Sequence, residues 1–218
     1  MKKLLYFILD LIYPPKCVFC RKIIDAECKG ICTECNKRLP RLCGNSRITR
    51  LEDGISCFSS LRYDSMVRDS FLRYKFYGAV SYAETYSMLL AEGIRDIESD
   101  FDLLTWVPLS RKRKRRRGYD QAELIAEGTS VLLGLDGKRI LYKNKETKAQ
   151  SLTRDRKERK TNIKGAWSLC DGADVKDKRI LVVDDIVTTG STLSECCKVL
   201  KEAGALSVTA ATLAKAAA

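Results

Sequence analysis

The feature that most constrains this chain is an apolar run that ends in two adjacent acids and a turn rich in hydroxyl residues. The run covers residues 180–183, the acids are Asp184 and Asp185, and the turn reads Thr-Thr-Gly-Ser-Thr over 188–192. A helix-compatible stretch, 193–203, follows and ends before a glycine. This order predicts a buried strand, a tight turn and the N-terminus of a helix, with both acids at a surface turn.

The chemistry of this segment suits a phosphorylated sugar. Unpaired backbone N–H groups at a helix N-terminus bind phosphate oxygens, and acids just before them suit sugar hydroxyls or a metal ion. A Walker loop is excluded because no Gly-Lys-Ser/Thr follows at the required spacing. An ordinary strand-to-helix turn is the alternative, but capping needs only one acid and no hydroxyl run. The predicted phosphate-binding residues are Thr188, Thr189, Gly190, Ser191 and Thr192.

The same string resembles the 5-phosphoribosyl-1-pyrophosphate (PRPP) motif of type I phosphoribosyltransferases, with two hydrophobic residues on each side of the acids. Four further motifs occur along the chain: Lys75-Phe76-Tyr77-Gly78, Val107-Pro108-Leu109, Arg117-Gly118-Tyr119-Asp120-Gln121 and Lys148-Ala149-Gln150-Ser151-Leu152. In their residues and their order they resemble the ComF family, competence-associated phosphoribosyltransferase-like proteins with an N-terminal cysteine segment, and the resemblance covers nearly the whole chain. Two positions depart from the family. Asp120 stands where asparagine is usual and cannot donate a hydrogen bond when ionised, and Pro40 takes the place of the cysteine that would pair with Cys43.

The resemblance implies an α/β type I phosphoribosyltransferase fold: a parallel sheet flanked by helices, with a hood at 143–164. Asp184 and Asp185 would be the catalytic acids that hold the ribose hydroxyls directly or through Mg²⁺. Arg113 and Arg117 would bind the pyrophosphate. No covalent nucleophile is required, so the absence of histidine from the chain is no obstacle.

Ten cysteines without histidine indicate a thiolate metal site rather than disulfides. Four of them form two Cys-x-x-Cys pairs eleven residues apart: Cys17, Cys20, Cys32 and Cys35. Two such pairs complete a tetrahedral shell, so we expect a structural Zn²⁺ that folds a segment too small for its own core. Cys28 and Cys43 are spare candidates, and reduced, unligated thiols are the alternative.

The positive charge is concentrated in two segments. The net charge is +12, of which Arg111–Arg117 supplies +7 and 143–164 supplies +6, leaving −1 for the rest. Both segments are expected to be loops. Their anionic target is the pyrophosphate of PRPP or the backbone of a nucleic acid, and a solvated charge run is the third interpretation.

The chain divides into an N-terminal helix with the four-cysteine zinc segment (1–50), a linker (51–56) and a phosphoribosyltransferase-like domain (57–215). Strands are expected at 57–63, 103–107, 139–142, 180–183 and 207–213, and helices at 65–77, 80–97 and 121–133. Residues 1–13 start like a signal peptide, but Asp10 interrupts the apolar stretch and no cleavage site follows. We therefore expect a cytoplasmic protein without a transmembrane segment, with loose attachment to the cytoplasmic membrane face as the alternative.

Three functions fit these expectations. The first is a phosphoribosyl-transfer enzyme acting in DNA uptake or related nucleic-acid metabolism. The second is a non-catalytic PRPP sensor that binds single-stranded DNA, and the third is a structural partner of a competence helicase. Purine salvage is disfavoured because Thr188 replaces the acid that serves the base in those relatives, and the sequence does not identify the acceptor.

Overall fold

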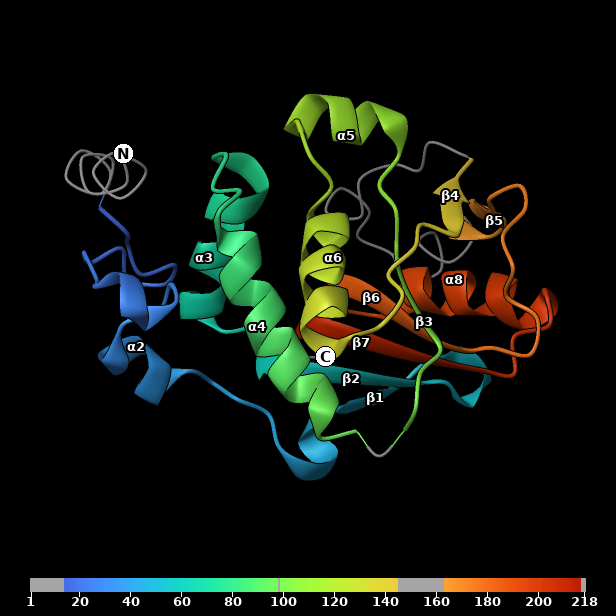
Figure 1. The fold of residues 1–218 in the computed structure, drawn as a ribbon, viewed down its shortest axis with the longest axis horizontal. Helices are drawn as coiled ribbons and strands as arrows, with labels where there is room; N and C mark the ends of the chain where they lie inside the picture. The colour runs from blue at the N-terminus through green and yellow to red at the C-terminus, as the bar shows by residue number, and fades with distance from the viewer. Residues whose placement is uncertain (1–13, 98, 145–162, 217–218) are drawn as a thin grey trace.

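The computed structural model describes residues 14–97, 99–144 and 163–216. The expected N-terminal helix and most of the hood lie outside these residues. The described part contains one large sheet with helices on both faces, and a cysteine-rich segment at one end (Figure 1).

The large sheet has five strands in the order β1-β2-β7-β6-β3. Four strands run parallel: β2 (Ser56–Arg62), β7 (Ser207–Lys215), β6 (Arg179–Val187) and β3 (Leu103–Trp106). The fifth, β1 (Ile48–Arg50), pairs antiparallel with β2 at the edge. The predicted parallel sheet is confirmed. The three-residue strand β1 was not predicted, because so short a segment shows no alternation of polar and apolar residues.

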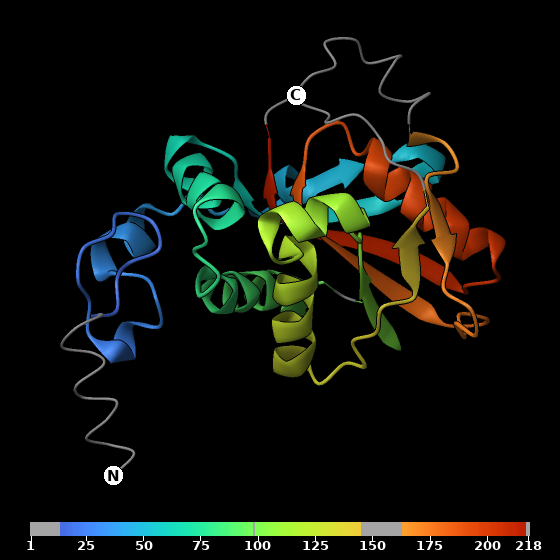
Figure 2. The ribbon, with the colours of Figure 1, turned by 90° about the horizontal axis from the view of Figure 1, so that it is seen from above.

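Helices cover the two faces of the sheet unequally (Figure 2). On one face lie α3 (Ser65–Phe76), α4 (Tyr82–Arg95) and α6 (Gln121–Leu133), and on the other lies α8 (Ser191–Glu202). Each face has its own buried apolar cluster, so the sheet separates two cores. This arrangement leaves the carboxyl ends of the parallel strands open, which is where ligands bind in such sheets.

The capping residues account for the helix ends. Asp64 accepts a hydrogen bond from the amide of Val67 and starts α3. Asp120 caps α6 in the same way, and Gly134, at a φ of 68°, ends it, so α6 has the predicted bounds. The helix expected at 80–97 is shorter at both ends.

The basic run is a helix, α5 (Arg111–Arg117), and the prediction of a loop there is wrong. Ser110 caps its first turn by accepting from the amide of Arg113, and Gly118 ends it at a φ of 83°. Lysine and arginine have good helix propensity, so two caps suffice to start and end one short helix. Charge repulsion within the run is reduced because Lys114 forms an ion pair with Glu123 of α6.

A two-stranded antiparallel sheet, β4 (Leu141–Lys143) and β5 (Trp167–Leu169), packs near α8. The N-terminal part contains α2 (Thr33–Arg38) and three 3₁₀ turns, η1 (Ala26–Cys28), η2 (Gly44–Arg47) and η3 (Glu52–Gly54). Both residues that flank η3, Leu51 and Ile55, are buried in the main domain's core.

Candidate functional site

The two acids belong to strand β6 and not to a surface turn, which corrects the sequence-based expectation. Side chains alternate along a strand, so neighbours point to opposite faces of the sheet. Val182 packs in the cluster on the α8 face, and Val183 packs in the cluster on the α3, α4 and α6 face. Asp184 and Asp185 continue this alternation, so their carboxyl groups lie on opposite sides of the sheet edge.

Asp184 is surrounded by protein although part of its surface is accessible. Its Oδ1 accepts a hydrogen bond from the amide of Asp185 at 2.8 Å. Burial of the carboxyl group, and then the negative charge of Asp185, raise the pKa of Asp184 well above its usual value. Lys75 opposes the rise in pKa but does not cancel it.

Asp185 forms an ion pair with a residue that the sequence analysis did not place in the site. Its Oδ2 lies 2.6 Å from Nζ of Lys75 on α3, and the side chains are 14% and 20% exposed respectively. The Lys75 ammonium group also lies 5.5 Å from the centre of the Phe71 ring. The available signal was the Lys75-Phe76-Tyr77-Gly78 motif, which carries a family resemblance but does not reveal the contact.

The hydroxyl-rich turn follows β6 directly and leads into α8. Gly190, at a φ of 77°, is the N-cap residue of that helix. Its neighbours Thr189 and Ser191 bring their hydroxyl oxygens within 3.1 Å of each other. The turn therefore presents hydroxyl groups and a helix N-terminus at the carboxyl end of β6, beside the two acids.

The two arginines expected at the pyrophosphate lie on α5. Arg117 donates to the side-chain oxygen of Gln121 at 2.6 Å, and its guanidinium group lies 5.2 Å from the ring centre of Phe76. Because Phe76 follows Lys75, Arg117 is held at the same end of α3 that supplies the Asp185 ion pair. Arg113 is partly buried one turn earlier.

Asp120 serves as an acceptor that joins two segments around the site. Its carboxylate accepts from the backbone amide of Leu109 at 2.7 Å, and from those of Ala122 and Glu123 at the start of α6. Burial of the side chain raises the pKa of Asp120, while these hydrogen bonds oppose the rise. The carboxylate thus fastens the segment after β3 to α6.

The cysteine segment contains a metal site. The sulfur atoms of Cys17, Cys20, Cys32 and Cys35 all lie within 4.8 Å of one another. Cys20 and Cys32 are 3.7 Å apart, close to the separation of about 3.8 Å between two ligands of a tetrahedral Zn²⁺ with 2.3 Å bonds. Four thiolates leave no position for water, so these residues suit a structural Zn²⁺, and the predicted four-cysteine segment is confirmed.

Helix α3 anchors this segment to the main domain. Arg73 donates from Nη2 to the carbonyl oxygens of Val18 and Phe19, both at 2.8 Å, and Ser70 donates to the same oxygen of Val18. These carbonyls belong to the loop between the first pair of cysteines. The zinc segment therefore rests on the helix that carries Lys75 (Figure 2).

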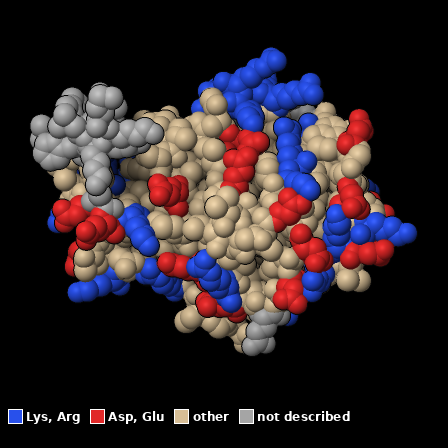
Figure 3. Space-filling view, in the orientation of Figure 1, with Lys and Arg blue, Asp and Glu red and all other residues tan. Residues whose placement is uncertain are grey.

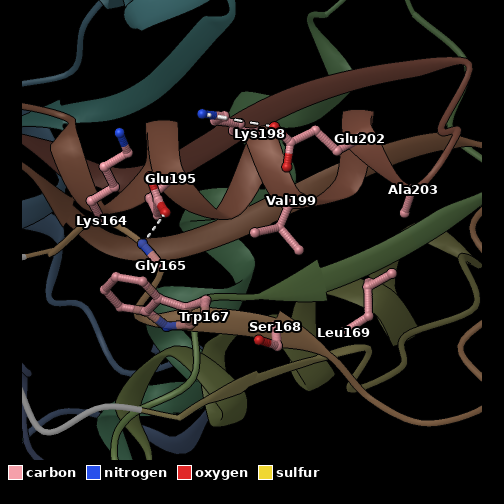
Figure 4. A pocket seen from close by; sticks show the side chains of 10 residues that line it. All are labelled: Lys164, Gly165, Trp167, Ser168, Leu169, Glu195, Lys198, Val199, Glu202 and Ala203. Atoms are coloured by element: carbon pink, nitrogen blue, oxygen red, sulfur yellow. Dashed lines mark hydrogen bonds and ion pairs between the residues drawn. The ribbon is translucent and has the colours of Figure 1, made fainter.

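A separate hollow of about 540 Å³ lies between β5 and α8 (Figure 4). Trp167 and Leu169 line one side and Val199 lines the other. Glu195 crosses one end, where its carboxylate accepts from the amide of Gly165. This hollow lies along α8 beyond the hydroxyl-rich turn.

Comparison with known families agrees with this architecture. Residues 114–218 match the family "Phosphoribosyl transferase domain", and residues 8–50 match the family "Double zinc ribbon domain". The chain is 28% identical over 210 residues to competence protein F of Haemophilus influenzae, which covers 87% of this chain and 92% of that protein. The chain is a ComF homologue.

Two further proteins of known families are similar to this chain in sequence. Competence protein ComFC of Streptococcus pneumoniae is 28% identical over 84% of this chain and 86% of its own length. The DNA utilization protein YhgH of Escherichia coli is 33% identical over 49% of this chain and 46% of its own length. Among solved structures, adenine phosphoribosyltransferase from Thermoanaerobacter pseudethanolicus is 16% identical with a TM-score of 0.42, covering 65% of this chain and 83% of its own, a likeness too distant to bear on the site.

Within 14–97, 99–144 and 163–216, every helix is too short or too polar to cross a bilayer.

Proposed function

We propose that this protein binds PRPP together with Mg²⁺ at the carboxyl end of β6 and acts in DNA uptake. The observation that carries the proposal is the direct succession of Asp184, Asp185, the hydroxyl-rich turn and the N-terminus of α8. The turn at 188–192 would bind the 5′-phosphate, and the acids would bind the ribose hydroxyls. The names of the relatives, competence and DNA utilization proteins, support the biological role.

Carboxylate oxygens suit Mg²⁺, which prefers hard oxygen ligands. When bound with PRPP, Mg²⁺ would neutralise part of the charge that develops on the pyrophosphate leaving group. Asp184 and Asp185 are the residues that would hold it. Arg117, fixed by Gln121 and Phe76, and Arg113 would bind the pyrophosphate oxygens.

Calorimetric titration of the purified protein with PRPP and Mg²⁺ tests the proposal. We expect Asp184→Asn and Asp185→Asn to weaken PRPP binding about tenfold or more, because each replaces a carboxylate that would hold Mg²⁺ or the ribose hydroxyls by a neutral amide. Asp174→Asn is the matched control, since its carboxylate is exposed and pairs with Lys178. Equal affinity in all four proteins would exclude this site. Pyrophosphate release with candidate acceptors then separates an enzyme from a PRPP sensor.

A nucleic-acid surface is the second candidate, and the orientation of α5 favours it. The helix turns four cations toward solvent at positions i, i+1, i+4 and i+5: Arg111, Lys112, Arg115 and Arg116. Arg113, Lys114 and Arg117 face the protein instead. Basic residues gather at the end of the molecule where α5 lies (Figure 3). The exposed ring of Phe76 lies beside Arg117, and Tyr77, which follows it in the chain, is exposed as well. Aromatic rings beside cations are typical of single-strand binding.

A further inference from the structure

We propose that Lys75 is the built-in cation of the sugar-phosphate site: its ammonium group pairs with Asp185 and competes with a divalent metal ion for that carboxylate, so that Mg²⁺ is held there together with PRPP and not alone. The proposal rests on the proposed function, because it concerns the same site. It predicts that the affinity for a metal ion alone is low and that PRPP recognition depends on the lysine.

The geometry of the ion pair is the first argument. The Lys75 and Asp185 side chains are mostly buried and 2.6 Å apart. The equally short pair between Lys138 and Asp136 is 63% and 50% exposed. Charges at an exposed site are screened by water, whereas a mostly buried charge depends strongly on its partner. Asp185 is therefore neutralised by Lys75 and not by solvent.

The surroundings of the pair are the second argument. The ammonium group lies over the Phe71 ring, which attracts a cation and keeps water from that side. Tyr63 and Tyr74 are close enough to Asp185 that its charge contributes to raising the pKa of both hydroxyls, after the larger effect of their burial. This apolar wall strengthens the attraction between the lysine and the carboxylate.

The origin of Lys75 is the third argument. The residue lies outside the match to the phosphoribosyl transferase family, which begins at residue 114. It comes from α3, whose Arg73 holds the zinc segment. The cation is thus supplied to β6 by a helix that belongs to the N-terminal half of the chain.

The chemistry follows from these positions. A divalent ion that approaches Asp185 must displace an ammonium group already in contact with Oδ2. PRPP brings hydroxyls and phosphate oxygens, to which the three N–H donors of the same ammonium group can donate without leaving the site. Lys75 therefore disfavours the metal ion alone and favours the anionic sugar.

A titration of the zinc-loaded protein with Mn²⁺ in the absence of PRPP, monitored by electron paramagnetic resonance, tests whether Lys75 lowers the affinity for a metal ion alone. We expect Lys75→Met to bind Mn²⁺ about tenfold more tightly than the wild type, because the competing charge is gone. Lys138→Met, which removes a lysine from an equally short but exposed pair, should leave the affinity unchanged. The double variant Lys75→Met, Asp185→Asn should lose the gain. Equal Mn²⁺ affinity in the wild type and Lys75→Met would overturn the proposal.

PRPP titrations of the zinc-loaded protein in buffer without Mg²⁺ or any other added divalent ion test whether PRPP recognition depends on the lysine. The wild type should bind metal-free PRPP about tenfold more tightly than Lys75→Met, and undiminished binding by the variant would overturn the proposal. If Lys75→Met does not fold, Lys75→Gln retains a hydrogen bond to Asp185 without the charge and gives the same comparisons. An absence of PRPP binding by the wild type would count against the proposed function. The Mn²⁺ titrations contain no PRPP, so they would still test the effect of Lys75 on metal affinity.

Discussion

The side chain of Leu51 lies against the backbone of Gly190, so a Cβ atom at position 190 would overlap Leu51 Cδ2. Leu51 is buried just before η3, and Gly190 is the N-cap of α8 with a φ of 77°. The segment between the zinc site and the main domain therefore supports the hydroxyl-rich turn from behind. Only glycine combines that backbone conformation with that contact.

Gly190→Ala is expected to lower the free energy of unfolding by about 1–3 kcal/mol and to weaken PRPP binding, because the turn must shift away from Leu51. Urea unfolding and calorimetry measure the two effects. Gly204→Ala is the control: its φ is 93°, but an added Cβ meets only ordinary contacts with Lys176. The control should lose stability and keep PRPP affinity. A Gly190→Ala protein with normal affinity would show that the turn does not hold phosphate.

Elemental analysis should find one zinc ion per chain. Cys17→Ser and Cys35→Ser should lose it, because each removes one of four thiolates. Cys196→Ser is the control, since that thiol is buried in the core on the α8 face. Loss of zinc from Cys28→Ser together with Cys43→Ser, and retention by Cys32→Ser, would contradict the ligand set.

Asp120 should contribute a stability term that decreases as the pH rises. Burial raises its pKa in the folded state above the ordinary value of 3.8, so the folded protein binds more protons than the unfolded chain between these two values. The stability of the wild type relative to Asp120→Asn should fall through that window and level off above it. Urea unfolding of both proteins over a pH series measures the difference. A difference that grows with pH would have the wrong sign.

The asparagine variant should still be less stable at every pH. Its amide oxygen can accept from the amides at the start of α6, but it cannot also present an acceptor to the amide of Leu109. The loss of that hydrogen bond should cost about 1 kcal/mol.

If α5 binds nucleic acid, removal of its outer cations should flatten the salt dependence. The variant replaces by alanine the exposed set Arg111, Lys112, Arg115 and Arg116. Single-stranded DNA binding by the wild type should give a slope of log K against log[salt] of about −0.7 per neutralised phosphate, and the variant a smaller slope with unchanged PRPP binding. A matched control removes four scattered exposed cations: Arg68, Lys138, Lys178 and Lys198. Equal slopes in variant and control would place the DNA surface elsewhere.

Features that depend on residues close together in the chain could be predicted from the sequence. The bounds of α6 follow from a capping acid at 120 and a glycine at 134, and the order of strand, turn and helix follows from residues 180–203, although the acids proved to lie within the strand. The paired cysteines predicted the cluster for the same reason, since each Cys-x-x-Cys unit is a local chelate.

Contacts between segments far apart in the chain became visible in the folded protein. No local pattern shows that Lys75 meets Asp185, that Leu51 lies behind Gly190, or that Arg73 holds the zinc segment, because each contact arises when separate elements pack. The basic run illustrates the same limit. Its composition is compatible with a loop or a helix, and the pairing of Lys114 with Glu123 of α6 helps to stabilise the helix. That packing divides the seven cations into an inner and an outer set.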